Sequence, residues 1–209
     1  MTKSSDRLLI GNVLKSIRIK KDIPIKQIAK KMKVSESMIS QLETGKNNFS
    51  KDKIIVYTNI CGCSFNFNIN RRDIIEKLID VYKIYSELKI EKFNNAISNL
   101  KKIPDIAFSS ARFEYYLILY MDNIVNKNIS NVEFIEKMIE IGINSFTNNE
   151  LAIYYDMQGL KYIYSKNSIK AVKFLEKSIS FNSNSLMNNY HHCTIFLNLG
   201  YYNLAQIFI

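Results

Sequence analysis

The sequence predicts an all-α protein, and three observations support this. Only two prolines and six glycines occur among the 209 residues, so few positions interrupt a helix. Leucine, isoleucine, phenylalanine and tyrosine recur at spacings of three and four, which place them on one face of a helix. Alternation typical of a strand is confined to SFNFNIN, residues 64–70, which we interpret as a connector. We therefore expect helices along nearly the whole chain.

The first third of the chain predicts a group of short helices. Leu9, Val13, Leu14 and Ile17 form an apolar stripe along the first of them. Pro24 can begin the second, because the first residue of a helix needs no amide proton. We expect five helices, at 8–21, 25–32, from Ser35 onward, from Ser50 or Lys51 to Ile60, and a short one near Ser64.

The third of these helices lies in KVSESMISQLETGK, residues 33–46, and is expected to turn a polar face outward. Ser35 can cap its first turn, Ile39 and Leu42 point to one side, and Gly45 provides the left-handed backbone that commonly ends a helix. The opposite side carries Glu36, Ser37, Ser40 and Gln41. Two short helices joined by a turn, the second with a polar outer face, predict a helix-turn-helix whose second helix enters the major groove of DNA.

The charge distribution favours the same interpretation. The net charge is +10, and residues 1–70 hold thirteen Lys/Arg against five Asp/Glu. The positive field therefore belongs to the first third of the chain. A small basic domain attracts polyanions, with nucleic acid the first candidate and an anionic membrane surface the second.

The motif that carries a family resemblance consists of apolar, acidic and glycine positions at Ile28, Ala29, Val34, Ile39, Leu42, Glu43 and Gly45. It resembles the Xre or phage-repressor type of helix-turn-helix, over residues 8 to about 67. In that family, bases are read at the first, second and sixth positions after the cap of the second helix. These positions fall on Glu36, Ser37 and Gln41.

The resemblance implies a role for each residue on this helix. The Gln41 amide can donate and accept together, which matches the N6 and N7 edge of adenine. Glu36 can accept from cytosine N4, Ser37 reads little by itself, and Met38 can touch a thymine methyl or simply pack. The alternative for all four is an ordinary solvated helix face.

Basic and amide side chains flank this helix and are expected to contact phosphates: Lys26, Lys30, Lys33, Lys46, Asn47 and Asn48. The alternative for each lysine is a solvated surface charge. Glu43 has a structural role in the resembling family, where this acid braces the domain. We expect its partner to be Arg18 on the first helix.

The last part of the chain shows a period of 34 residues. It relates four pairs of positions: Gly159 and Cys193, Tyr162 and Phe196, Ala171 and Ala205, and Leu175 and Ile209. Small residues at the first and third pairs let helices approach closely. The pattern resembles the tetratricopeptide repeat, and a plain packed helical bundle is the alternative. The expected fold is therefore an all-α protein with an N-terminal five-helix helix-turn-helix domain followed by a degenerate tetratricopeptide-like array.

A helix-turn-helix followed by such an array resembles the Rgg, PlcR and PrgX group of peptide-responsive regulators. We expect a DNA-binding domain at 1–67, a linker helix at 68–90 and a regulatory domain at 91–209 that is incomplete at its C-terminus. In this group a DNA-binding homodimer is controlled by a short signalling peptide bound to the concave face of the repeats. Here that face would carry Asp156, Leu160, Tyr164, Tyr190, Thr194 and Asn198, or these are ordinary surface and core residues.

Other function classes find little support in the sequence. It contains no glycine-rich phosphate loop, no nucleophile elbow and no metal-ligand spacing, so we expect neither an enzyme nor a cofactor. His191, His192 and Cys193 are adjacent and fan out over different helix faces, and the three cysteines Cys61, Cys63 and Cys193 suggest free buried thiols.

The sequence contains no run of the roughly 18 to 20 apolar residues that are needed to span a bilayer, and no signal peptide is recognisable. We therefore expect a cytoplasmic protein with no membrane partner. The sequence thus predicts a transcriptional regulator that binds double-stranded DNA. The alternative is an interaction module whose helix-turn-helix and repeats bind proteins.

Overall fold

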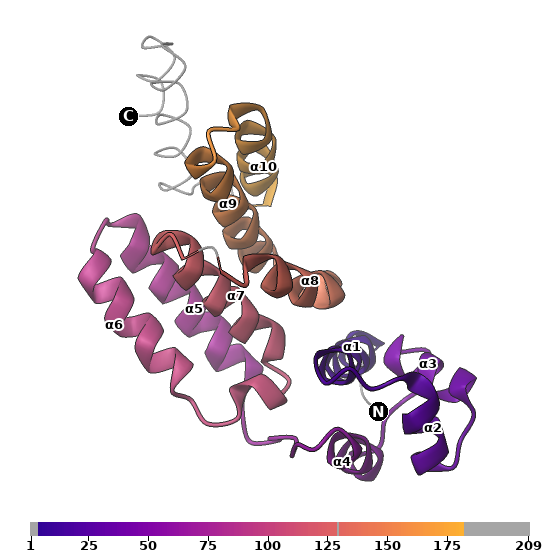
Figure 1. The fold of residues 1–209 in the computed structure, drawn as a ribbon. Helices are drawn as coiled ribbons and strands as arrows, with labels where there is room; N and C mark the ends of the chain where they lie inside the picture. Colours follow the sequence, from indigo (N-terminus) through magenta and orange to yellow (C-terminus); the bar gives the residue numbers. More distant parts are fainter. Residues whose placement is uncertain (1–3, 129, 182–209) are drawn as a thin grey trace. The chain divides into compact units, whose positions relative to one another are not determined.

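The computed structural model describes residues 4–128 and 130–181, and within them the protein is all-α. Ten α-helices and two short 3-10 helices account for the regular structure of this part of the chain. The predicted fold class is confirmed, and the first four helices form the predicted helix-turn-helix domain (Figure 1).

The first four helices lie where the sequence places them: α1 Ser4–Lys20, α2 Ile25–Met32, α3 Glu36–Glu43 and α4 Lys51–Ile60. Pro24 precedes α2 with φ −70°, and Ser50 caps α4 by accepting from the amide of Lys53 at 3.3 Å. Only α1 differs from the prediction: it begins at Ser4, four residues before the predicted start at residue 8.

A predicted fifth helix near Ser64 is absent from the structure. Residues 64–70 form the connector that the alternating sequence indicates, and Asn66 makes an isolated parallel bridge with Ser109. Its amide donates to the carbonyl of Phe108 at 2.8 Å. The next helix, α5, begins at Arg71 and ends at Ser86. A hydrogen bond to a distant segment thus fixes the backbone of Asn66, and Asn66 Oδ1 also accepts from the amide of Asn68 in a turn at residues 67–68.

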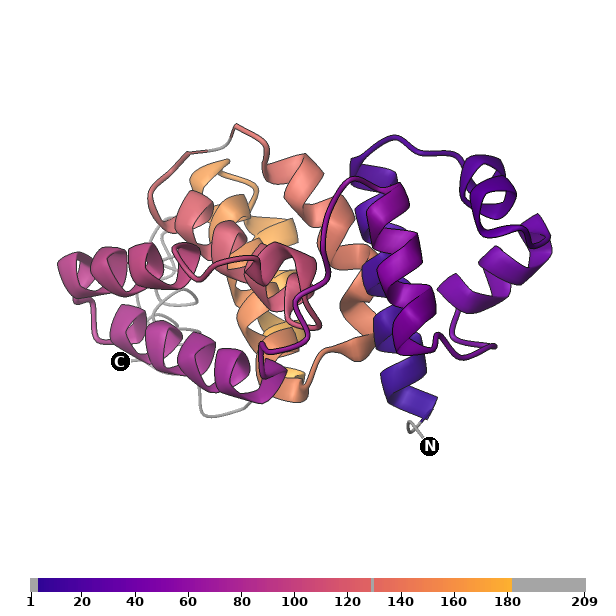
Figure 2. The same ribbon diagram turned by 90° about the horizontal axis from the view of Figure 1, so that it is seen from below.

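The helix-turn-helix has its own apolar core. α1 packs against α3 and α4, and α2 packs against the same two helices, with α4 beside α1 in Figure 2. Leu14, Ile28, Ile39, Leu42 and Tyr57 are fully buried among them. Burying side chains of this size is worth about 1.5 to 3 kcal/mol each relative to leaving them exposed, so this core fixes how α3 is presented.

The close approach of α1 to α3 depends on Gly11. A Cβ atom at this position would lie 2.5 Å from the carbonyl oxygen of Leu42 and 2.8 Å from that of Glu43. Both are backbone atoms of α3, which cannot move aside as a flexible side chain can. Glycine is therefore required for α1 and α3 to touch.

Five further α-helices follow α5 within the described residues. They are α6 Ile90–Lys101, α7 Arg112–Val125, α8 Val132–Gly142, α9 Asn148–Tyr164 and α10 Ser168–Phe181, with short 3-10 helices at Ile106–Phe108 and Ile143–Ser145. α9 begins with a capping box, in which Thr147 and Glu150 satisfy each other's backbone amides. Local capping thus fixes where α9 begins.

One compact unit contains residues 4–74 together with 102–116 and 133–145. Arg112 is fully buried in it. Its Nε donates to Ser16 Oγ at 2.5 Å and its Nη2 to the Tyr116 hydroxyl at 3.0 Å, while Nη1 donates to the carbonyl of Ala107. Burial lowers the pKa of Arg112. Helix α1 is thereby hydrogen-bonded to a residue 96 positions further along the chain. The domain limits predicted at residues 67 and 90 stay a prediction.

In the other compact unit, whose described residues are 75–101, 117–128, 130–132 and 146–181, α9 and α10 lie side by side (Figure 1). Gly159 faces Leu175, whose side chain occupies the space that a Cβ would need, and Tyr162 stacks on Phe174 with ring centroids 5.4 Å apart. The expected close approach at a small residue is present here. The second member of each residue pair in the 34-residue period, from Cys193 to Ile209, lies outside the described residues. The tetratricopeptide-like array therefore stays a prediction.

Candidate nucleic-acid interface

The turn between α2 and α3 is fixed by local hydrogen bonds. Lys33 ends α2 in the left-handed conformation with φ 54°, and the amide of Val34 donates to the carbonyl of Ala29 at 3.0 Å. Ser35 then caps α3, as predicted, by accepting from the amide of Met38 at 3.1 Å. These contacts set the direction in which α3 leaves α2.

Helix α3 has the predicted division into two faces. Ile39 and Leu42 are buried against the domain core, and Gly45 follows the helix with φ 70°. The outer face exposes Glu36, Ser37, Ser40 and Gln41, with Met38 half-buried at its edge. The structure therefore brings all four predicted base-contacting residues onto one accessible helix surface.

Gln41 is held by hydrogen bonds at both ends of its side-chain amide. Its Oε1 accepts from Asn47 Nδ2 at 2.7 Å, and its Nε2 donates to Ser37 Oγ at 3.4 Å. Asn47 Nδ2 also lies 3.4 Å from Met38 Sδ. The residue with the most informative donor and acceptor pattern is thus oriented before any ligand arrives.

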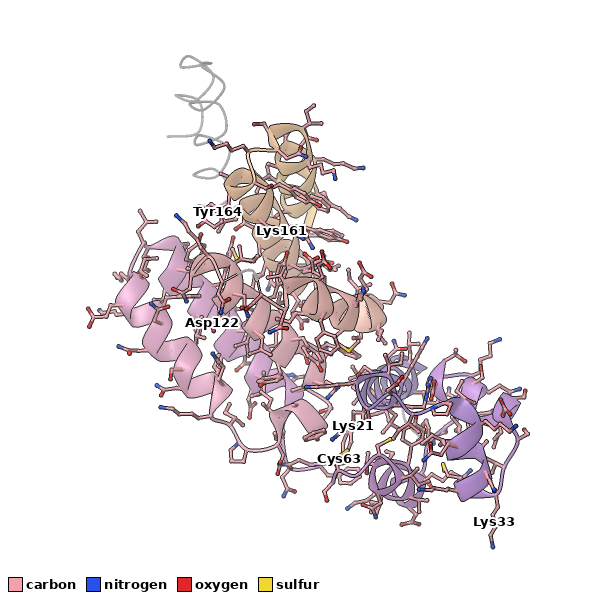
Figure 3. All side chains as sticks on the ribbon, viewed as in Figure 1. Lys21, Lys33, Cys63, Asp122, Lys161 and Tyr164 are labelled. Atoms are coloured by element: carbon pink, nitrogen blue, oxygen red, sulfur yellow. The ribbon has the colours of Figure 1, made fainter. Side chains whose placement is uncertain are left out.

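The predicted phosphate contacts surround this face. Lys26 and Lys30 lie on α2, Lys33 lies in the turn and points away from the ribbon in Figure 3, and Lys46 and Asn48 follow α3. All five are exposed. Within the described parts of the chain, none of the four lysines forms a salt bridge, so their charges are available to an anion. Asn47 differs, because it is half-buried and already hydrogen-bonded.

Glu43 has the bracing role predicted for it, and Arg18 is its partner. The Glu43 carboxylate is 2% exposed and accepts from Arg18 Nε at 2.7 Å and Nη2 at 2.8 Å. The Tyr57 hydroxyl donates to the same carboxylate at 2.5 Å, a contact that the sequence did not predict. The hydrogen bonds to Glu43 raise the pKa of Arg18, and burial raises that of Tyr57. One carboxylate therefore ties α3 to α1 and α4.

The predicted peptide-contacting residues lie in different environments. Asp156 is fully buried and accepts from the Tyr82 hydroxyl at 2.9 Å, and Leu160 is also buried. These two residues offer no open surface as placed, because packing and a hydrogen bond occupy them. Tyr164 is 42% exposed, with Lys127 Nζ 4.9 Å from its ring centroid. Tyr190, Thr194 and Asn198 lie outside the described residues, and peptide binding stays a prediction.

Cys61 and Cys63 are free thiols; Cys61 is buried as predicted, whereas Cys63 is half-buried, and Cys193 lies outside the described residues. Burial raises the pKa of Cys61 to about 11, so this thiol is protonated at neutral pH. Cys63 lies near Lys21 in Figure 3, and burial raises its pKa too. Where side chains are described, no group of three or more His, Cys, Asp and Glu residues is placed to hold a metal ion. Over the same range, no helix is long and apolar enough to cross a membrane.

A comparison with protein families agrees with this geometry. Residues 14–68 match the family described as Helix-turn-helix, a span that includes α2, α3 and every predicted base and phosphate contact. No match is found among curated proteins or among solved structures. Residues 14–68 therefore form an Xre-type helix-turn-helix domain, and this domain supports DNA-binding regulation in general.

Proposed function

We propose that this protein is a sequence-specific transcriptional regulator that reads double-stranded DNA with the outer face of α3. The observation that carries the proposal is the oriented Gln41 amide on the outer face of α3, which four exposed lysines flank. Lysines of this kind contact phosphates and fix the register, while side chains on the helix contact base edges. This function needs no catalysis or cofactor, and its site of action would be cytoplasmic DNA.

We further propose that the regulator acts as a homodimer. A single helix of eight residues contacts few base pairs, and specific sites are usually read as two half-sites about one helical turn apart. A second copy of the chain is the simplest source of the second helix. A binding site without two-fold symmetry would contradict this part of the proposal.

Control by a short signalling peptide is the third part of the proposal. It is supported by the resemblance to the Rgg, PlcR and PrgX group and by the helical region after residue 71. Of the predicted peptide contacts that the structure describes, Tyr164 exposes the largest surface. Isothermal titration of the full chain with short peptides should detect heat of binding, and its absence for every peptide would contradict this part.

The alternative is a protein-interaction module, and the dependence of affinity on salt separates the two. Binding through about six to ten phosphates should lose roughly 10³ to 10⁵ in affinity between 50 and 200 mM salt, because counterions are released from DNA. Fluorescence anisotropy with the full chain and a labelled duplex measures this. We expect Lys30→Ala to reduce the slope of log affinity against log salt by about one.

Lys173→Ala is the matched control, because Lys173 is an exposed lysine on α10, distant in sequence from the helix-turn-helix. It should leave the slope unchanged. Affinity that barely varies with salt, or equal effects of the two substitutions, would favour the interaction module.

A further inference from the structure

Asn47 is predicted from the sequence as a phosphate contact, but its hydrogen bonds point to another role. It lies three residues beyond the C-terminal cap of α3 and turns back onto that helix. Its backbone amide donates to the carbonyl of Gln41 at 3.1 Å, and its side-chain Nδ2 donates to Gln41 Oε1 at 2.7 Å. Main chain and side chain of one residue thus both hold Gln41.

The orientation of both amides follows from the chemistry of their neighbours. Met38 Sδ, 3.4 Å from Asn47 Nδ2, can only accept, so it favours the arrangement in which the Asn47 amide nitrogen faces inward. That nitrogen can only donate, so the group of Gln41 that faces it must be the carbonyl oxygen. If the Gln41 amide were reversed, two donors would face each other.

The other end of Gln41 tolerates this orientation. Ser37 Oγ accepts from Gln41 Nε2 at 3.4 Å, and a hydroxyl can equally donate or accept. The direction is therefore set at the Asn47 end. After these bonds, Gln41 keeps one N–H and one acceptor site for a base, in a fixed order along the helix surface.

We propose that Asn47 is a positioning residue that fixes the Gln41 amide and so determines which base Gln41 selects. The inference rests on the proposed function, because it concerns how α3 discriminates among DNA sequences. A donor and an acceptor in fixed order match one base edge in the major groove, as glutamine does with adenine N6 and N7. A freely rotating amide would accept either order and discriminate less.

The first test is independent of DNA. Side-chain ¹⁵N relaxation of the free full chain should show the Gln41 amide more rigid than that of Gln27, an exposed glutamine on α2. Asn47→Ala should make the Gln41 amide as mobile as Gln27. Equal mobility of the two glutamines in the unsubstituted protein would overturn the inference, whether or not the protein binds DNA.

The second test uses a duplex selected from a random library and variants of it with single base-pair changes. Gln41→Ala first identifies the base pair that Gln41 reads. Asn47→Ala should then reduce discrimination at that base pair about five- to tenfold, leave the salt slope unchanged and add little in the Gln41→Ala background. Asn48→Ala, the neighbouring exposed asparagine, should not alter discrimination.

A uniform effect of Asn47→Ala on all duplexes would contradict the inference. If Asn47→Ala weakens binding by the same factor on every duplex and its effect adds to that of Gln41→Ala, Asn47 contacts phosphate and the inference is wrong. If the unsubstituted chain selects no duplex, the proposed function fails, and the relaxation measurement still decides whether Asn47 holds Gln41.

Discussion

Replacing Arg18 with methionine is expected to lower the free energy of unfolding by about 3 to 5 kcal/mol, because it leaves a buried carboxylate without its cation. Glu43 is 2% exposed, and Arg18 provides two of the three side-chain donors that it accepts from. The hydroxyl of Tyr57 remains but carries no charge. Urea unfolding of both proteins measures the difference.

Two further variants make this prediction specific. The double variant Arg18→Met with Glu43→Leu should be considerably more stable than Arg18→Met alone, because it removes the unpaired buried charge together with its partner. Lys101→Met removes a more exposed ion pair, in which Lys101 Nζ lies 2.8 Å from Asp122 Oδ2. It should cost at most about 1 kcal/mol. Equal effects of Arg18→Met and Lys101→Met would show that the Glu43 network does not brace α3.

Gly11→Ala should lower the free energy of unfolding by about 2 to 3 kcal/mol, although alanine is the better helix former by about 1 kcal/mol. The added Cβ would lie 2.5 Å from the carbonyl oxygen of Leu42, so α1 and α3 must separate. Because α3 carries the proposed base contacts, affinity for DNA should fall along with stability. Thermal or urea unfolding, followed by anisotropy at a temperature where the variant is folded, measures both.

Gly62→Ala is the matched control. Gly62 has φ 69° and nothing within 4 Å of an added Cβ, so only backbone strain of about 1 to 2 kcal/mol opposes the substitution. It should leave affinity for DNA unchanged. If Gly11→Ala were as stable as the unsubstituted protein, the close packing of α1 on α3 would be wrong.

The parts of the fold that local chemistry determines could be predicted from the sequence. Ser35 and Ser50 cap helices, Pro24 precedes one, and apolar residues recur every three to four positions, so the boundaries of α2, α3 and α4 agree with the structure. The pairing of Arg18 with Glu43 was predicted only through the family motif. It joins residues 25 positions apart, and nothing local indicates it.

Features that depend on distant contacts were not predicted. The backbone of Asn66, in the connector at 64–70, is hydrogen-bonded to Phe108, and the buried Arg112 donates to Ser16. An exposed arginine and a buried one look alike in a single sequence. The same is true of Asn47, which reads as a surface amide until the position of Gln41 is known.

Selection of bound sequences from a random duplex library, with the full chain and with Gln41→Ala in parallel, tests the central claim most directly. The claim predicts that the unsubstituted chain enriches one two-fold symmetric sequence. It also predicts that Gln41→Ala retains that sequence except at one base pair in each half-site, where the preference falls by about 1 to 3 kcal/mol. No enrichment with either protein, or identical preferences at every position, would contradict the claim that α3 reads DNA through Gln41.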